Sequence, residues 1–195
     1  RIEKLKVGPD TSGNDVDYGP VVTAEAKKNI EKLVQTGIDQ GAQLIVDGRN
    51  FSLQGYEDGF FVGPHLFDHA TKDMDIYTKE IFGPVLTQVR AKTYEEAISL
   101  AMDHEYGNGT AIFTRDGDTA RDFANRINIG MVGINVPIPV PLAYHTFGGW
   151  KKSVFGDLNQ HGPDAFKFYT RTKTVTARWP SGIKEGEEFS IPVME

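Results

Sequence analysis

Apolar positions recur at helical spacing in three segments of the chain, and short apolar runs stand between these segments. Ile30, Leu33, Val34 and Ile38 follow Thr23, a typical N-cap residue, and Gly41 ends the pattern. Further helices are expected after the capping box that begins at Thr93 and over Asp118–Asn128. The expected strands are Ala42–Val46, Phe60–Val62, Val85–Ala91, Thr110–Thr114 and Gly130–Val136. This alternation predicts an α/β fold with one main domain, in which helices flank a layered, largely parallel sheet.

The two ends of the chain show different patterns. Arg1–Leu5 is typical of the end of a helix, and Gly162-Pro163 precedes an expected helical turn at Asp164–Phe168. Thr172–Trp179 alternates two faces, which predicts a lone strand with few residues to bury it, and the residue types alone place it at the edge of this domain. Ser181–Glu195 is rich in Gly and Glu and is expected to be a surface tail.

Composition narrows the classes of protein to which the chain can belong. Its 195 residues suffice for one domain with a real core, and its formal net charge of −6 disfavours nucleic acid as a partner. No apolar run approaches the roughly 18 residues of a membrane span, so we expect no membrane partner and a cytoplasmic location. The chain has no cysteine, which excludes disulfides and thiol chemistry within it.

Histidine and aspartate near residue 65 raise the question of a metal site. His65 and His69 stand four apart with Asp68 between them, a spacing that would suit a metal only on a helix. Gly63-Pro64 precedes them and no third ligand is evident. We therefore expect no metal site.

The segment Lys79–Pro84 joins a charged, turn-rich stretch to the apolar run that begins at Val85. Gly83-Pro84 forces a change of chain direction, because Gly permits unusual backbone angles and Pro fixes φ. Glu80 thus precedes a rigid turn at a strand edge, where its carboxylate can meet a ligand. The residue types alone also allow a solvated Glu beside an ordinary loop.

The segment Ile134–Leu142 alternates proline with mostly β-branched residues. This pattern predicts a stiff, extended loop with few backbone donors. Such a loop is either a structural connector or the apolar wall of a pocket, since rigid loops beyond the ends of α/β strands commonly line binding sites.

Several of these motifs together resemble the aldehyde dehydrogenase family. The sequence Lys-Glu-Ile-Phe-Gly-Pro-Val over residues 79–85 is similar to a signature of that family, and the other matches follow the family's order: Gly19-Pro20, Gly59-Phe60-Phe61, Tyr106-Gly107 and Asn135. The resemblance extends to about Pro180. It implies NAD as cofactor, with Glu80 bonded to the nicotinamide ribose hydroxyls and Phe82 packed near the nicotinamide. It also implies that Asn135 supports the floor of the site and that Phe147 borders the substrate entrance.

A second group of motifs resembles one branch of this family. Asn135–Pro141, Phe147–Ser153 and Phe155–Asp157 are similar to the CoA-acylating branch that acts on methylmalonate semialdehyde in valine and inositol catabolism. Val154 and Gly156-Asp157 depart from the pattern of most aldehyde dehydrogenases in the way this branch does. The resemblance implies a small semialdehyde substrate, CoA as co-substrate, and oxidation through a cysteine thioester with decarboxylation.

The resemblance also implies a division of the chain. Residues 1–165 correspond to the C-terminal part of the catalytic domain, 166–180 to a strand region through which subunits pair as dimers or tetramers, and 181–195 to a C-terminal tail. The catalytic cysteine and the dinucleotide-binding half are expected upstream, so this chain carries no catalytic residue and is expected to be inactive alone. The alternatives are a non-catalytic assembly module of similar fold and a non-acylating aldehyde dehydrogenase with another substrate.

Overall fold

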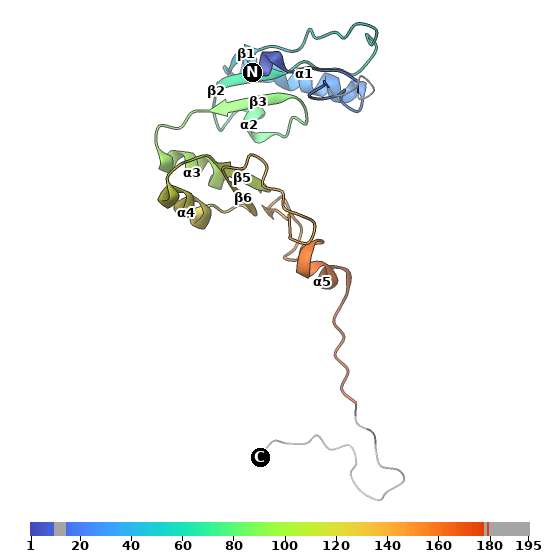
Figure 1. Ribbon diagram of the computed structural model, residues 1–195, viewed down its shortest axis with the longest axis vertical. Coiled ribbons are helices and arrows are strands. Elements are labelled where there is room, and N and C mark those ends of the chain that lie inside the picture. The colour runs from blue at the N-terminus through green and yellow to red at the C-terminus, as the bar shows by residue number, and fades with distance from the viewer. Residues whose placement is uncertain (10–14, 178, 180–195) are drawn as a thin grey trace, which may run out of the picture.

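The computed structural model describes residues 1–9, 15–177 and 179, and it places short helices and strands along two separate cores (Figure 1). The elements, in chain order, are η1 (Ile2–Lys4), α1 (Ala24–Asp39), β1 (Gln43–Val46), β2 (His65–Ala70), α2 (Asp75–Thr78), β3 (Val85–Val89), α3 (Tyr94–Asp103), β4 (Tyr106–Gly107), β5 (Gly109–Ile112), α4 (Gly117–Arg126), β6 (Met131–Ile134), β7 (Trp150–Lys151), η3 (Gly162–Asp164) and α5 (Ala165–Tyr169).

The first core, called here the N-terminal core, lies between α1 and a three-stranded sheet. The sheet has the order β1-β2-β3, with β1 antiparallel and β3 parallel to β2. Thr23 caps α1 by accepting a hydrogen bond of 3.0 Å from the Ala26 amide, and the helix then buries Ile30 and Val34. The buried residues of this core are Ile30, Val34, Ala42, Val62, Phe67, Ala70, Met74 and Ile76. The predicted helical pattern after Thr23 is confirmed.

The second core, called here the C-terminal core, is formed by Ile98, Phe123, Ile127 and Ile129 beside the parallel pair β5–β6. Thr93 caps α3 as predicted, because its hydroxyl accepts from the Glu96 amide at 3.2 Å. The Glu96 carboxylate accepts from the amide of Lys92 at 2.7 Å, one residue before the partner that a capping box would use. The helices predicted after Thr93 and near Asp118 are both present.

The α/β class is confirmed, but the expectation of a largely parallel sheet is wrong. The described residues form three sheets, of three, two and two strands, and the pairs β1–β2 and β4–β7 are antiparallel. The prediction of a strand at Phe60–Val62 is also wrong, since these residues have no ladder pairing and the strand begins later, at His65. Phe61 and Val62 are buried as loop residues, and a short apolar run cannot distinguish a buried loop from a strand.

Beyond η3 and α5, which confirm the expected turn near Asp164, the chain runs away from both cores (Figure 1). Residues 170–177 and 179 pair with no described strand of this chain, so a strand within this domain is not formed. A strand between subunits stays a prediction, and the expected tail at 181–195 lies outside the described residues. At the other end, the expected end of a helix is the short 3-10 turn Ile2–Lys4. None of the described helices is long and apolar enough to cross a bilayer.

One polar side chain is buried in the first half of the chain. His65, at the start of β2, is 1% exposed, and neither ring nitrogen has a hydrogen-bond partner among the described residues. Its Nε2 atom lies 3.9 Å from Oδ1 of Asp47, whose pKa is held at about 2 by its hydrogen bonds to Arg49. Burial lowers the pKa of His65, and the nearby Asp47 charge opposes this effect only in part.

We expect His65 to make the protein less stable in mild acid. The pKa of His65 is lower in the folded than in the unfolded chain, so the unfolded chain binds more protons once the pH falls below about 6.5. Stability is therefore full above that pH and is lost as the pH falls, by at most about 1.4 kcal/mol per pH unit. Urea unfolding of the wild type and His65→Leu between pH 5.5 and 8 tests this, with a shallower acid slope expected in the variant. Equal slopes in the two proteins would contradict the prediction.

Candidate functional site

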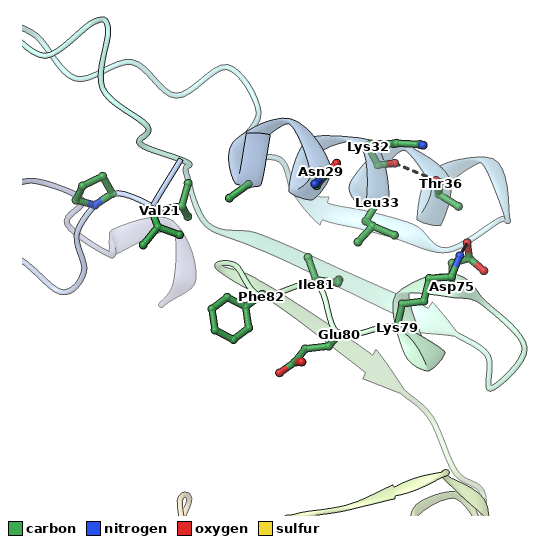
Figure 2. Close-up of a pocket in the computed structure, with 13 residues that line it drawn as sticks. Val21, Asn29, Lys32, Leu33, Thr36, Asp75, Lys79, Glu80, Ile81 and Phe82 are labelled. Carbon is green, nitrogen blue, oxygen red and sulfur yellow. Dashed lines mark hydrogen bonds and ion pairs between the residues drawn. The ribbon is translucent and has the colours of Figure 1, made fainter. Parts of the chain in front are cut away.

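A groove of about 670 Å³ runs along α1 and ends at the segment after α2 (Figure 2). One wall consists of α1 side chains, among them Asn29, Leu33 and Thr36, and Val21 and Val22 also line the groove. Lys79, Glu80, Ile81 and Phe82 form the facing wall. The groove thus lies between the side chains of α1 and the segment 79–82 that follows α2.

The charged residues of this wall have different surroundings. Lys79 Nζ is 2.6 Å from Oδ2 of Asp75, one helical turn earlier, and this hydrogen bond lowers the pKa of Asp75. Glu80 is exposed, and its carboxylate makes no hydrogen bond or ion pair with any described residue. Figure 2 shows Ile81 pointing toward α1 and Glu80 pointing away from it. The two carboxylate oxygens of Glu80 are therefore available to a ligand that carries hydroxyl donors.

Phe82 occupies an unusual backbone position. Its φ is +58°, in the left-handed region, and the residue is 79% exposed. The next residue, Gly83, packs directly on α1, because a Cβ there would stand only 2.8 Å from Cγ1 of Ile30. After it, the Pro84 carbonyl accepts a 2.8 Å hydrogen bond from the His65 amide, where the β2–β3 ladder begins. The close approach of Gly83 to α1 and this ladder hold Phe82 in a conformation that an aromatic residue seldom adopts.

A second cavity, of about 500 Å³, lies on the other side of Glu80. Lys79 and Glu80 line both cavities, and the remaining walls of the second come from Tyr77, Thr78, His104, Tyr106, Asn108, Lys152 and Ser153. Lys152 pairs with Glu105, and the Ser153 hydroxyl accepts from the Gly107 amide at 3.0 Å. Glu80 thus stands on the ridge between an elongated groove and a polar cavity.

The structure brings Glu80 and Phe82 together but places Asn135 and Phe147 elsewhere. Asn135, just after β6, exchanges two hydrogen bonds of 3.0 Å with the backbone of Thr114. Phe147 stacks on the His161 ring with centroids 4.1 Å apart. Neither residue lines the groove or the second cavity. Their roles at the floor and entrance of a site stay predictions.

Two residues beside the second cavity escaped the sequence analysis. Tyr77 and His104 contact each other across the two halves of the chain, with their rings 5.3 Å apart and nearly perpendicular. They are 27 residues apart and belong to no shared motif, so no local pattern pairs them.

No group of three or more His, Asp or Glu side chains suited to a metal occurs in the described part of the chain. His65 and His69 lie on strand β2 rather than on a helix.

Comparison with known proteins relates this chain to one family. The profile of the aldehyde dehydrogenase family matches residues 1–175. A malonate-semialdehyde dehydrogenase of Pseudomonas aeruginosa is 54% identical over 98% of this chain and 39% of its own length.

Solved structures give the same result. A candidate methylmalonate-semialdehyde dehydrogenase of Sinorhizobium meliloti 1021, complexed with NAD, is 69% identical, with a TM-score of 0.87 over 93% of this chain and 37% of its own. The methylmalonate-semialdehyde dehydrogenase of Oceanimonas doudoroffii is 56% identical, with a TM-score of 0.85 over 92% of this chain and 37% of its own. The chain thus spans less than half the length of these relatives. With the family profile matching 175 of its 195 residues, it belongs to the aldehyde dehydrogenase family.

Proposed function

We propose that this chain forms part of an NAD-dependent, CoA-acylating dehydrogenase of methylmalonate or malonate semialdehyde, and that it supplies the nicotinamide-ribose side of the cofactor site. The observation that carries the proposal is the pair Glu80 and Phe82 on one wall of the groove. The names of its relatives, and the NAD in the Sinorhizobium meliloti structure, support the choice of substrate class and cofactor.

The side chains of this wall fit a nicotinamide riboside. The Glu80 carboxylate is exposed and unpaired among the described residues, and two adjacent ribose hydroxyls are donors that a carboxylate accepts with both oxygens. The neighbouring Phe82 ring is exposed and offers a flat apolar surface to a planar ring. Lys79, which would otherwise neutralise Glu80, is already paired with Asp75.

When bound, NAD would accept a hydride from the substrate, while the residues of this chain bind and orient it. This chain has no cysteine, so the nucleophile that forms a thioester belongs to another part of the complete protein. We further propose that the acyl group passes to CoA after loss of CO2, that residues 1–165 form part of the catalytic domain, and that 166–180 pair subunits into an oligomer. Within this site, Asn135 and Phe147 are assigned to the floor and the substrate entrance.

Glu80→Gln in the complete enzyme tests the proposal. Gln keeps the size of the side chain but loses the charge, so NADH formation from methylmalonate semialdehyde and CoA is expected to fall about 10- to 100-fold in kcat/KM for NAD. The same assay should show no NADH formation without CoA. Glu3→Gln, at an exposed Glu in η1 outside both cavities, is the matched control and should leave the rate unchanged. Unchanged turnover and NAD affinity in Glu80→Gln would contradict the role of Glu80.

A further inference from the structure

Tyr77, three residues before Glu80, connects the two halves of the chain. We infer that Tyr77 is a positioning residue that fixes where the Glu80 carboxylate stands between the groove and the second cavity; this rests on the cofactor role proposed above for Glu80. Of the two cavities beside Glu80, Tyr77 lines the second and does not line the groove.

The Tyr77 hydroxyl completes the end of α3. It donates a 2.8 Å hydrogen bond to the carbonyl of Leu100, one of the last four residues of that helix. Carbonyls in the last turn of a helix have no partner within the helix and need one from outside. Lys151 Nζ serves the following carbonyls in the same way, donating to Met102 at 2.7 Å and to His104 at 3.0 Å. Tyr77 is therefore bound at a place where the helix needs a donor.

The Tyr77 backbone makes a second contact with the same region. Its carbonyl lies 3.3 Å from Nε2 of His104, and the Tyr106 amide donates to Nδ1 of that ring at 3.2 Å. A carbonyl only accepts and an amide N–H only donates, so the His104 tautomer with its proton on Nε2 satisfies both bonds. Hydroxyl and carbonyl of one residue thus hold α2 against the end of α3.

These contacts matter because few others join the two halves. Between residues 15–91 and residues 97–177, the described chain has only these two hydrogen bonds, one donated by the Tyr77 hydroxyl and one accepted by the Tyr77 carbonyl. The preceding residue, Ile76, is buried in the N-terminal core against Gly37. Two neighbouring residues of α2 are therefore held by different parts of the chain: Ile76 by the N-terminal core and Tyr77 by the end of α3.

Among the described residues, Glu80 has no hydrogen-bond partner to hold it. Its position relative to Tyr106 and Lys152, across the second cavity, follows from the backbone that leaves α2. Loss of the Tyr77 hydroxyl frees the Leu100 carbonyl and loosens this segment toward the C-terminal core. The expected consequence is a misplaced carboxylate and weaker binding of NAD, with a smaller change in the chemical step.

Tyr77→Phe in the complete enzyme removes only the hydroxyl. We expect the dissociation constant of NAD, measured by titration calorimetry, to rise about three- to tenfold, with kcat changed less than KM for NAD. Tyr94→Phe is the matched control, because its hydroxyl donates to Asp122 at 2.9 Å and joins α3 to α4 away from both cavities. Both variants lose one hydroxyl group, so thermal unfolding of each separates a loss of stability from a loss of position.

A double-mutant cycle with Glu80→Ala decides whether Tyr77 acts through Glu80. In the Glu80→Ala enzyme, Tyr77→Phe should change NAD affinity no more than Tyr94→Phe does. An undiminished effect of Tyr77→Phe in that background would overturn the inference. So would a normal NAD affinity of Tyr77→Phe alongside a weakened Glu80→Ala, although Glu80 would keep its proposed role. If Glu80→Ala itself binds NAD normally, the proposed cofactor role is the claim that fails.

Discussion

Replacing Phe67 with alanine is expected to lower the free energy of unfolding by about 3–5 kcal/mol. Phe67 lies in the central strand β2, is 0% exposed, and belongs to the N-terminal core with Ile30 and Val34 of α1. Its ring reaches Gly37 so closely that a Cβ on that glycine would stand only 3.1 Å from Cζ of Phe67. Because the neighbouring residues are already closely packed, they can move only slightly into the cavity that alanine would create.

Urea unfolding of the complete protein at fixed concentration measures this loss. Phe113→Ala is the control. Phe113 is 66% exposed, so this substitution should change the free energy of unfolding by no more than about 0.5 kcal/mol. A loss below about 1 kcal/mol for Phe67→Ala would show that the core adjusts far more than its packing indicates.

The second large effect is expected from Gly48→Ala, which should lower the free energy of unfolding by about 3 kcal/mol. Gly48 lies in the loop after β1, and its backbone meets that of Gly63 just before β2. A Cβ on Gly48 would stand 2.7 Å from Cα of Gly63 and closer still to its carbonyl group. The same contact includes a 3.1 Å hydrogen bond from the Gly63 amide to the Gly48 carbonyl. Since both sides of the contact are backbone, no rotamer change relieves the overlap.

Gly19→Ala provides the comparison for Gly48→Ala. A Cβ at Gly19 meets only the Gly8 carbonyl, at an ordinary 3.8 Å, so its stability should change by at most about 0.5 kcal/mol. The melting temperatures of the two variants should therefore differ clearly. Equal melting temperatures would mean that the Gly48–Gly63 contact can open without cost.

Sequence reasoning succeeded where the signal is local. Thr23 and Thr93 each bond an amide three residues ahead, so the cap and the helix it starts are encoded in one short stretch. Sequence reasoning failed at Phe60–Val62. The backbone of this loop is positioned by the contact between Gly63 and Gly48, and no periodicity in either loop indicates that the two loops meet. The division of the sheet has the same cause, since strand partners are set by contacts between distant segments.

The candidate site shows the same limit. Glu80 and Phe82 belong to one continuous motif beside a Gly-Pro turn, so a resemblance could single them out. Tyr77 lies next to that motif, but its importance depends on the Leu100 carbonyl, which only the folded chain brings within 2.8 Å. Lys151 likewise bonds carbonyls 47 to 50 residues before it.

The left-handed backbone of Phe82 lowers the stability of the chain, while its exposed ring serves the proposed function. A non-glycine residue in that region costs about 1–2 kcal/mol, and the exposed ring recovers little of this by packing in the described chain. Glycine or asparagine would relieve the strain and discard the aromatic surface. Selection of variants for heat resistance alone would therefore favour removing Phe82, so engineering of this protein has to measure cofactor binding and stability together.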